Sequence, residues 1–202
     1  MGRHGTAIID YTAEIDPTAH IGPYCIIGAR VKIGPRTRVL AHAVIGGPPE
    51  SRMHWNNWDY GVEIGADCFI GNAVTIDSGT RRNTRIGDGC ILLRHSHVGH
   101  DAVIEQDVVL SCNVLIGGHT HVMRGANCGL GSIVHQNHLV GSYAMLGAGT
   151  IVPKKRDIVP GNTYVGNPAE LLKVNAVGLK MHGVTNEVLA EEIELWKELK
   201  RK

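Results

Sequence analysis

Aromatic residues are scarce in this chain: it has three Trp, five Tyr and one Phe in 202 residues. The core must therefore be aliphatic rather than built from stacked rings. The chain also has no large excess of positive or negative charge, because its formal net charge is +1. Such a charge offers no general attraction to nucleic acid. No apolar stretch approaches the length that spans a membrane, and no signal peptide is recognisable.

The five cysteines lack the paired spacing of a zinc ribbon. They are Cys25, Cys68, Cys90, Cys112 and Cys128. Most of them fall at positions that the repeat described below directs inward, so we interpret them as buried, reduced packing residues. Reduced thiols are typical of a cytoplasmic protein, and we expect that location.

A six-residue period of aliphatic residues dominates the sequence. Uninterrupted runs of this period begin at Ile9, Ile64 and Ile86 and hold 24 positions, of which 22 are Ile, Leu or Val. The period matches neither the 3.6-residue repeat of an amphipathic helix nor the alternation of an ordinary strand. It predicts short strands that are joined by tight turns and stacked as coils, with the aliphatic residues directed to a shared axis.

Twelve of the 24 aliphatic positions are followed directly by glycine, as at Gly22 and Gly34. We expect these glycines to accommodate a positive φ at the corners of the coils. The pattern resembles the hexapeptide repeats of acyltransferases, which implies an all-β solenoid, a left-handed parallel β-helix with three hexads in each coil. The 24 hexads then give about eight coils, and a spacing of ~4.8 Å between strands makes the prism roughly 40 Å tall.

The repeats extend over residues 5–166, and residues 167–202 follow as a C-terminal helical extension. Two inserts, near 46–62 and 77–85, interrupt the period. When three hexads are counted to a coil, both inserts leave the prism at the same corner on successive coils. Two neighbouring loops at one corner would form the wall of a ligand site, so we place the functional site there.

One amphipathic helix is expected within the extension, over residues 185–201. Thr185 can cap its N-terminus, Glu187 lies in its first turn, and an apolar stripe includes Leu195 and Trp196. Such a helix needs a covering surface, either its own prism or a neighbouring subunit. The flat faces of the prism are also exposed, so we expect an oligomer, and the resemblance implies a homotrimer.

The corner that carries the inserts also carries histidines on three successive coils. The residues are His100 and Asp101 on the first coil, Gly117, Gly118 and His119 on the second, and His135 and Gln136 on the third. Residues 18 apart should stack, so His100 is expected beneath Gly118, with His119 as a diagonal neighbour at roughly 5–7 Å. The two glycines would leave a notch between the imidazoles.

Residues 97–101, with the sequence HVGHD, resemble the H-x-x-H-D motif of the UDP-N-acetylglucosamine O-acyltransferases, which begin lipid A biosynthesis. The segments 117–119 (GGH) and 134–136 (VHQ) follow at matching spacing, and Asn167 matches too. The similarity extends to about residue 192 and is densest between 95 and 140.

This resemblance implies acyl transfer from a thioester carrier, acyl carrier protein or coenzyme A, to a hydroxyl of a sugar nucleotide such as UDP-N-acetylglucosamine. It implies that His100 is the general base, that Asp101 supports it, and that the Gly118 N–H binds the thioester oxygen. The implied substrate contacts are His97, His119, His135, Gln136, Asp77 and Asn167. We expect neither a bound cofactor nor a metal ion.

Three features depart from the family pattern. Asp77 occupies the position at which the family has a histidine, and this position contributes to the acceptor pocket. The first insert carries Trp55 and Trp58, on which a base or sugar could stack, in place of an Asn-Gln-Asp segment that contacts the sugar nucleotide. Met181 and His182 replace two arginines, and the helical domain that helps to bind acyl carrier protein and nucleotide is reduced to about one helix.

Other functions stay open at this point. Residues 165–169 (VGNPA) also resemble the ending of hexapeptide acetyltransferases, which would use acetyl-CoA to acetylate a sugar. His95, His97 and His100 could be zinc ligands, as in the γ-carbonic anhydrases built on the same prism, although Asp101 and the glycine notch fit acyl transfer better. A non-catalytic scaffold is the third alternative.

Overall fold

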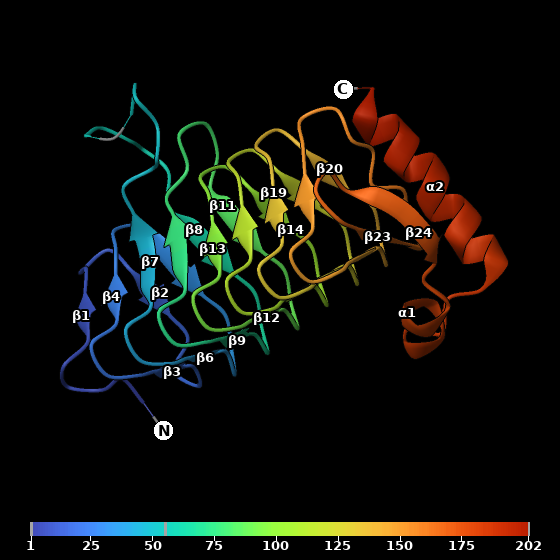
Figure 1. Cartoon of the computed structure of the whole chain (residues 1–202). Helices are drawn as coiled ribbons and strands as arrows, with labels where there is room; N and C mark the ends of the chain where they lie inside the picture. Colours follow the sequence, from blue (N-terminus) through green and yellow to red (C-terminus); the bar gives the residue numbers. More distant parts are fainter. Residues whose placement is uncertain (1, 55, 202) are drawn as a thin grey trace.

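The computed structural model describes residues 2–54 and 56–201, and it shows a parallel β-solenoid followed by a short helical segment (Figure 1). Its strands are two to five residues long and form three sheets, which make the three sides of a prism. The fold is the left-handed parallel β-helix that the resemblance to the hexapeptide-repeat acyltransferases implies. Short strands follow from the hexads, because each hexad spends about four of its residues on a turn.

The first sheet has eight strands: β1 (Ile8–Ile9), β4 (Ile26–Ile27), β7 (Val44–Gly47), β10 (Thr75–Asp77), β13 (His97–Val98), β16 (Leu115–Ile116), β19 (Ile133–Val134) and β22 (Ile151–Val152). The second sheet has seven: β2 (Glu14–Ile15), β5 (Val31–Ile33), β8 (Val62–Ile64), β11 (Thr84–Ile86), β14 (Val103–Ile104), β17 (His121–Val122) and β20 (Leu139–Val140). The third sheet has nine: β3 (His20–Ile21), β6 (Arg38–Val39), β9 (Phe69–Ile70), β12 (Ile91–Leu92), β15 (Val109–Leu110), β18 (Asn127–Cys128), β21 (Met145–Leu146), β23 (Asn162–Val165) and β24 (Glu170–Val174).

The register of the first sheet follows the predicted circuit of 18 residues. Val98 pairs with Ile116, Ile116 with Val134, and Val134 with Val152. These four side chains are buried, with at most 1% of their surface exposed, so the aliphatic members of the hexads form the core. The predicted stacking of distant histidines at one corner rests on this register.

The prediction for the glycines that follow the aliphatic residues was wrong at most corners. The left-handed residue lies three positions after the aliphatic one and is often not glycine, as at Arg30 and His119, with φ of 59° at both. The glycines instead allow successive coils to approach closely. A Cβ on Gly22 would lie 3.0 Å from backbone atoms of the next coil, and one on Gly34 would lie 2.7 Å away. Steric closeness between coils therefore explains the repeated glycine.

The C-terminal segment begins with a strand that the sequence did not predict. After β23, strand β24 turns back and pairs with it antiparallel, and helix α1 (Ala176–Met181) follows with Asn175 as its cap. Helix α2 (Asn186–Lys200) is the predicted one, and the Thr185 hydroxyl accepts from the Val188 N–H at its start. Among the described residues, no helix is both long and apolar enough to cross a membrane.

Helix α2 is covered by its own prism. The buried residues of α2 are Glu192 and Trp196, whereas Leu195 of the predicted stripe is 42% exposed. Glu192 is held by the Arg124 guanidinium and by the Ser142 hydroxyl, both on the prism. The helix is therefore fixed by a buried charged contact as well as by an apolar side chain, which the hydrophobic pattern does not reveal.

Candidate active site

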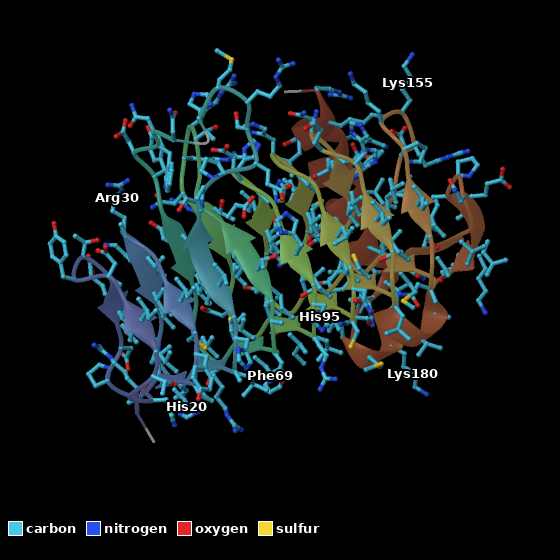
Figure 2. All side chains as sticks on the ribbon, turned by 60° about the vertical axis from the view of Figure 1, so that its left-hand side comes forward. His20, Arg30, Phe69, His95, Lys155 and Lys180 are labelled. Carbon is cyan, nitrogen blue, oxygen red and sulfur yellow. The ribbon has the colours of Figure 1, made fainter. Side chains whose placement is uncertain are left out.

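Both inserts leave the prism at one corner. Segment 48–61 follows β7 and segment 78–83 follows β10, and each returns to the second sheet, in β8 and β11. In Figure 1 the two loops extend past the strand ends on the same edge of the prism. Figure 2 shows Arg30 and Lys155 on this edge, while His20, Phe69 and His95 lie on the opposite side of the prism.

His100 and Asp101 lie at this corner, between β13 and β14. The His100 Nδ1 and the Asp101 Oδ2 are 2.7 Å apart, and the Asp101 side chain is fully buried. An ionised carboxylate only accepts hydrogen bonds, so Nδ1 must carry the proton and donate it. The Nε2 atom of His100 is then the ring nitrogen that can exchange a proton with a bound molecule.

The second insert wraps the Asp101 carboxylate with backbone N–H groups. The N–H groups of Thr80, Arg81 and Arg82 lie 3.0, 2.7 and 3.0 Å from Oδ1, and the Thr80 hydroxyl donates to Oδ2 at 2.7 Å. Burial opposes ionisation, but the hydrogen bonds from His100 and from this loop outweigh it and hold the pKa of Asp101 well below its usual range. Asp101 therefore stays ionised and fixes the orientation of His100.

Sequence reasoning missed this role of the loop. One signal was available in Gly79, because a Cβ there would lie 1.6 Å from the Arg82 carbonyl oxygen. Only glycine fits a turn that tight, so Gly79 indicates a compact loop rather than an open one.

Gly118 lies against the imidazole of His100 on the adjoining coil, as the stacking predicts. A Cβ on Gly118 would fall 2.8 Å from the His100 Nε2, so the glycine leaves room for the ring. Its own N–H has no hydrogen-bond partner among residues 2–54 and 56–201, whereas the neighbouring Gly117 and His119 N–H groups bind carbonyls. A Cβ on Gly99 would lie 2.7 Å from the Gly118 nitrogen, so glycine at position 99 keeps this donor uncovered.

His119 completes the corner from the next coil. Its ring meets that of His100 edge to face, with the centroids 4.8 Å apart, slightly closer than predicted. Its Nε2 lies 3.6 Å from the Asp101 Oδ2. Burial lowers the pKa of His119, and the nearby charge of Asp101 offsets this only in part. A neutral imidazole beside His100 can donate or accept a hydrogen bond without adding charge.

His97 and Asp77 form a second polar group beside His100, together with Glu50 from the first insert. The His97 Nδ1 is 2.8 Å from the Thr75 hydroxyl, and its Nε2 is 3.9 Å from Glu50 and 4.0 Å from Asp77. Burial, with the nearby charge of Glu50, raises the pKa of Asp77 to about 7. Burial lowers the pKa of His97. Sequence reasoning missed Glu50, because loop conformation does not follow the repeat.

A cavity of about 340 Å³ opens over the glycines, and we name it the glycine cavity. Its lining brings together residues of three coils and the first insert: Glu50, His97, Gly99, His100, Leu115, Ile116, Gly117, Gly118, Ile133, Val134, His135 and Gln136. The predicted residues His135 and Gln136 are exposed at its rim, where the His135 Nδ1 lies 2.9 Å from the Gln136 carbonyl oxygen.

Two of the singled-out residues lie away from this cavity. Asn167 is exposed in the turn between β23 and β24 and is not part of the lining. Trp58 is half-buried, and its carbonyl accepts from the Arg30 guanidinium at 2.6 Å, so the loop is tied to the prism there. Trp55 lies outside the described residues.

Two groups of side chains at the corner could in principle hold a metal ion: His100 with Asp101 and His119, and Glu50 with Asp77 and His97. In the first group the carboxylate is already occupied, since five hydrogen-bond donors of His100, Thr80, Arg81 and Arg82 surround Asp101. A metal ion would have to displace several of them. The arrangement fits a base held by a carboxylate better than a metal site.

Comparisons with known proteins agree with the repeat. The family described as bacterial transferase hexapeptide (six repeats) matches residues 12–47. The acyl-[acyl-carrier-protein]–UDP-N-acetylglucosamine O-acyltransferase of Rhizobium etli is 35% identical over 156 residues, which cover 76% of this chain and 56% of that protein. The chain thus spans little more than half the length of the curated relatives it matches.

Solved structures extend the match to the whole chain. The UDP-N-acetylglucosamine O-acyltransferase of Moraxella catarrhalis superposes with a TM-score of 0.80 at 30% identity, covering 100% of this chain and 86% of that one. The UDP-N-acetylglucosamine acyltransferase of Francisella novicida gives a TM-score of 0.81 at 28% identity, with 96% and 78% covered. The likeness therefore includes the corner of His100 and the C-terminal segment.

Proposed function

Because this chain belongs to the hexapeptide-repeat family of UDP-N-acetylglucosamine O-acyltransferases, we propose that it transfers an acyl group from a thioester carrier to a hydroxyl of a sugar nucleotide such as UDP-N-acetylglucosamine. One observation carries the proposal above the others. The His100 Nε2 lies over Gly118, whose N–H is unpartnered within the described residues, while a buried carboxylate holds Nδ1. A base and an oxyanion donor thus face the same small space.

In the proposed reaction, the His100 Nε2 takes the proton of the acceptor hydroxyl as its oxygen attacks the thioester carbon. The carbonyl oxygen becomes an oxyanion, and the Gly118 N–H stabilises it, an interaction typically worth ~3 kcal/mol. Collapse of the intermediate breaks the C–S bond, and the leaving thiolate takes the proton from the imidazolium. Asp101 stabilises that imidazolium and stays ionised throughout. The products are an ester and a free thiol.

The substrate contacts proposed for His97, Asp77, His119, His135 and Gln136 follow from their positions around His100. The first insert adds Glu50 to this wall. Asn167 is not part of the lining of the glycine cavity in its own chain, so we propose that it contacts the substrate of a neighbouring subunit.

The proposal includes a homotrimer in which the first sheet is covered. The outer face of this sheet is apolar, with Ile8 68% exposed, Ile26 44% and Leu115 42%. The second sheet instead carries charged pairs, such as Lys32 with Glu14 at 3.2 Å. An apolar face that also borders a cavity is typical of a subunit interface. Light scattering after gel filtration tests the trimer, and a monomer would contradict it.

We also propose a cytoplasmic location, because four of the five thiols are buried and all are free, which suits a reducing compartment. Fractionation of cells that produce the protein at its natural level tests this location. Recovery in an oxidising compartment would contradict it.

The activity is tested by mass spectrometry of UDP-N-acetylglucosamine incubated with the protein and a panel of donors. The panel holds acyl carrier proteins charged with chains of several lengths, together with acetyl-CoA. The proposal expects an acylated sugar nucleotide with at least one carrier-bound chain. Acetylation by acetyl-CoA alone would instead identify the sugar acetyltransferase. Acylation of neither kind, with activity only after zinc is added, would favour the metal enzyme.

A further inference from the structure

A second cavity lies between helix α2 and the second sheet, and we name it the helix cavity. Its volume is about 850 Å³, and it is lined by Arg82, His119, His121, Asn137, His138, Leu139, Lys154, Lys155, Asp157, Trp196, Leu199 and Lys200. These residues come from the second insert, from turns at the corner of His100, from β17 and β20, and from the last turns of α2. The covering helix thus makes a pocket from what would otherwise be an open sheet edge.

The helix cavity is strongly cationic. Four of its lining residues are Lys or Arg, and the one carboxylate, Asp157, is paired with Lys200. Arg82, Lys154 and Lys155 have no ion-pair partner within residues 2–54 and 56–201. The three side chains are exposed around a partly enclosed space, and the Arg82 Nε also donates to the Asp101 carbonyl oxygen at 3.0 Å. Their positive charges attract phosphate groups, which bind Lys and Arg through charge-assisted hydrogen bonds.

Neutral donors complete the wall. Trp196 is 6% exposed, and its indole N–H has no partner among the described residues. The Lys200 ammonium lies 5.2 Å from the centre of the Trp196 ring, so the two side chains support each other. Burial lowers the pKa of His138, whose Nε2 bonds the Arg156 carbonyl oxygen. This bond ties the turn that carries Lys154 and Lys155 to the prism.

The glycine cavity has the opposite character. Its lining contains Glu50 and no Lys or Arg among the described residues, and Asp77 lies behind it. Phosphate groups would therefore meet Lys and Arg side chains in the helix cavity, whereas the described lining of the glycine cavity offers none. The two cavities meet at the ring pair of His100, which lines the glycine cavity, and His119, which lines the helix cavity.

We propose that the helix cavity is the phosphate-binding site of this enzyme, in which Arg82, Lys154 and Lys155 hold the phosphate groups of a substrate whose reacting end lies at His100. The identity of that substrate rests on the proposed function. It is either the sugar nucleotide, through its diphosphate, or the thioester carrier, through its phosphopantetheine phosphate. The shared chemistry is a phosphate ester, and the sources are separated by experiment.

The first experiment measures binding of inorganic pyrophosphate to the full chain by calorimetry. We expect the double variant Lys154→Glu with Lys155→Glu to bind at least about tenfold more weakly than the natural protein. The matched control changes Lys173→Glu and Lys180→Glu, which alters the net charge equally on exposed residues outside the cavity. Its affinity should stay within about twofold of the natural one. No binding by the natural protein, or an equal loss in both double variants, would overturn the proposal.

Tryptophan fluorescence locates the bound pyrophosphate. Because Trp196 lines the cavity, pyrophosphate should change the emission of the natural protein but not that of Trp196→Phe, which should still bind in calorimetry. Binding without any change that depends on Trp196 would place the ion elsewhere and overturn the proposal.

The source of the phosphate is separated by two comparisons, UDP against uridine and phosphopantetheine against pantetheine. In one of the two pairs, the Lys154 and Lys155 changes should weaken binding of the phosphorylated compound and leave binding of the other compound unchanged. That pair identifies the occupant of the helix cavity. If neither pair responds, the proposal fails. These measurements use His100→Ala as well as the natural protein. Loss of turnover in that variant tests the proposed function, whereas its pyrophosphate affinity should be unchanged, so the two ideas can fail separately.

Discussion

Replacing Gly99 by alanine tests whether the open approach to the Gly118 N–H matters for catalysis. The added Cβ would lie 2.7 Å from the Gly118 nitrogen and 3.1 Å from the Gly117 carbonyl carbon, whereas ordinary contacts begin at 3.4 Å. The coils must separate by about 0.7 Å, or the methyl group covers the donor. A misplacement of ~1 Å typically costs about 10²-fold in rate, and loss of an oxyanion donor costs about 10²–10³-fold.

The matched control is Gly22→Ala, which creates a similar but slightly looser contact between coils far from the site. Its Cβ would lie 3.0 Å from the backbone of residues 39–41. Both variants should lose about 1–3 kcal/mol of unfolding free energy through overpacking, as measured in urea. Only Gly99→Ala should lose at least about 10²-fold in kcat with UDP-N-acetylglucosamine and its best donor.

Equal effects on kcat in the two variants would refute this reasoning, because the loss would then come from general distortion of the prism. An active Gly99→Ala that is destabilised as expected would also refute it. The Gly118 N–H would in that case have no part in the rate.

Three further predictions concern buried acids. Asp101→Asn should lower kcat by roughly 10³–10⁴-fold, as measured by stopped-time mass assays. It should also lower the melting temperature, as measured by calorimetry, because the N–H groups of residues 80–82 lose part of their acceptor. Asp77 keeps its proton when folded up to about pH 7 but loses it near pH 3.8 when unfolded, so its contribution to stability falls as pH rises between these values. The melting temperature of Asp77→Asn relative to the natural protein should therefore rise from pH 4 to pH 7, and a constant difference would contradict this. Glu192→Gln should cost about 1–3 kcal/mol in urea unfolding, because Arg124 loses its charged partner in helix α2, and an unchanged midpoint would contradict this.

The repeat made the fold predictable because a fixed period places every inward side chain at once. Once 18 residues complete a circuit, the neighbours of His100 on the adjoining coils follow by counting, and the pairing of Val98 with Ile116 agrees. The same count places both inserts at one corner. Helix α2 was predictable from its cap and its apolar residues, although the count of hexads says nothing about where it packs.

The features that were missed or wrong do not follow the period. The left-handed turn residues are often Arg, His or Asp, so no glycine marks them in the sequence. Gly22 and Gly34 are glycines because the backbone of the neighbouring coil leaves no room for a Cβ. The cradle around Asp101 depends on the backbone of a loop, and Glu50 reaches the site from another loop. A loop conformation is decided by contacts that sequence spacing does not encode.

The proposed reaction depends on His100 as the general base at the corner of the prism. The most direct measurement is turnover of UDP-N-acetylglucosamine with its best acyl donor by His100→Ala, beside His54→Ala as a matched histidine in the first insert. We expect a loss of at least about 10²-fold in kcat for His100→Ala and a rate within about twofold of the natural one for His54→Ala. A His100→Ala protein that retains its natural rate would contradict it.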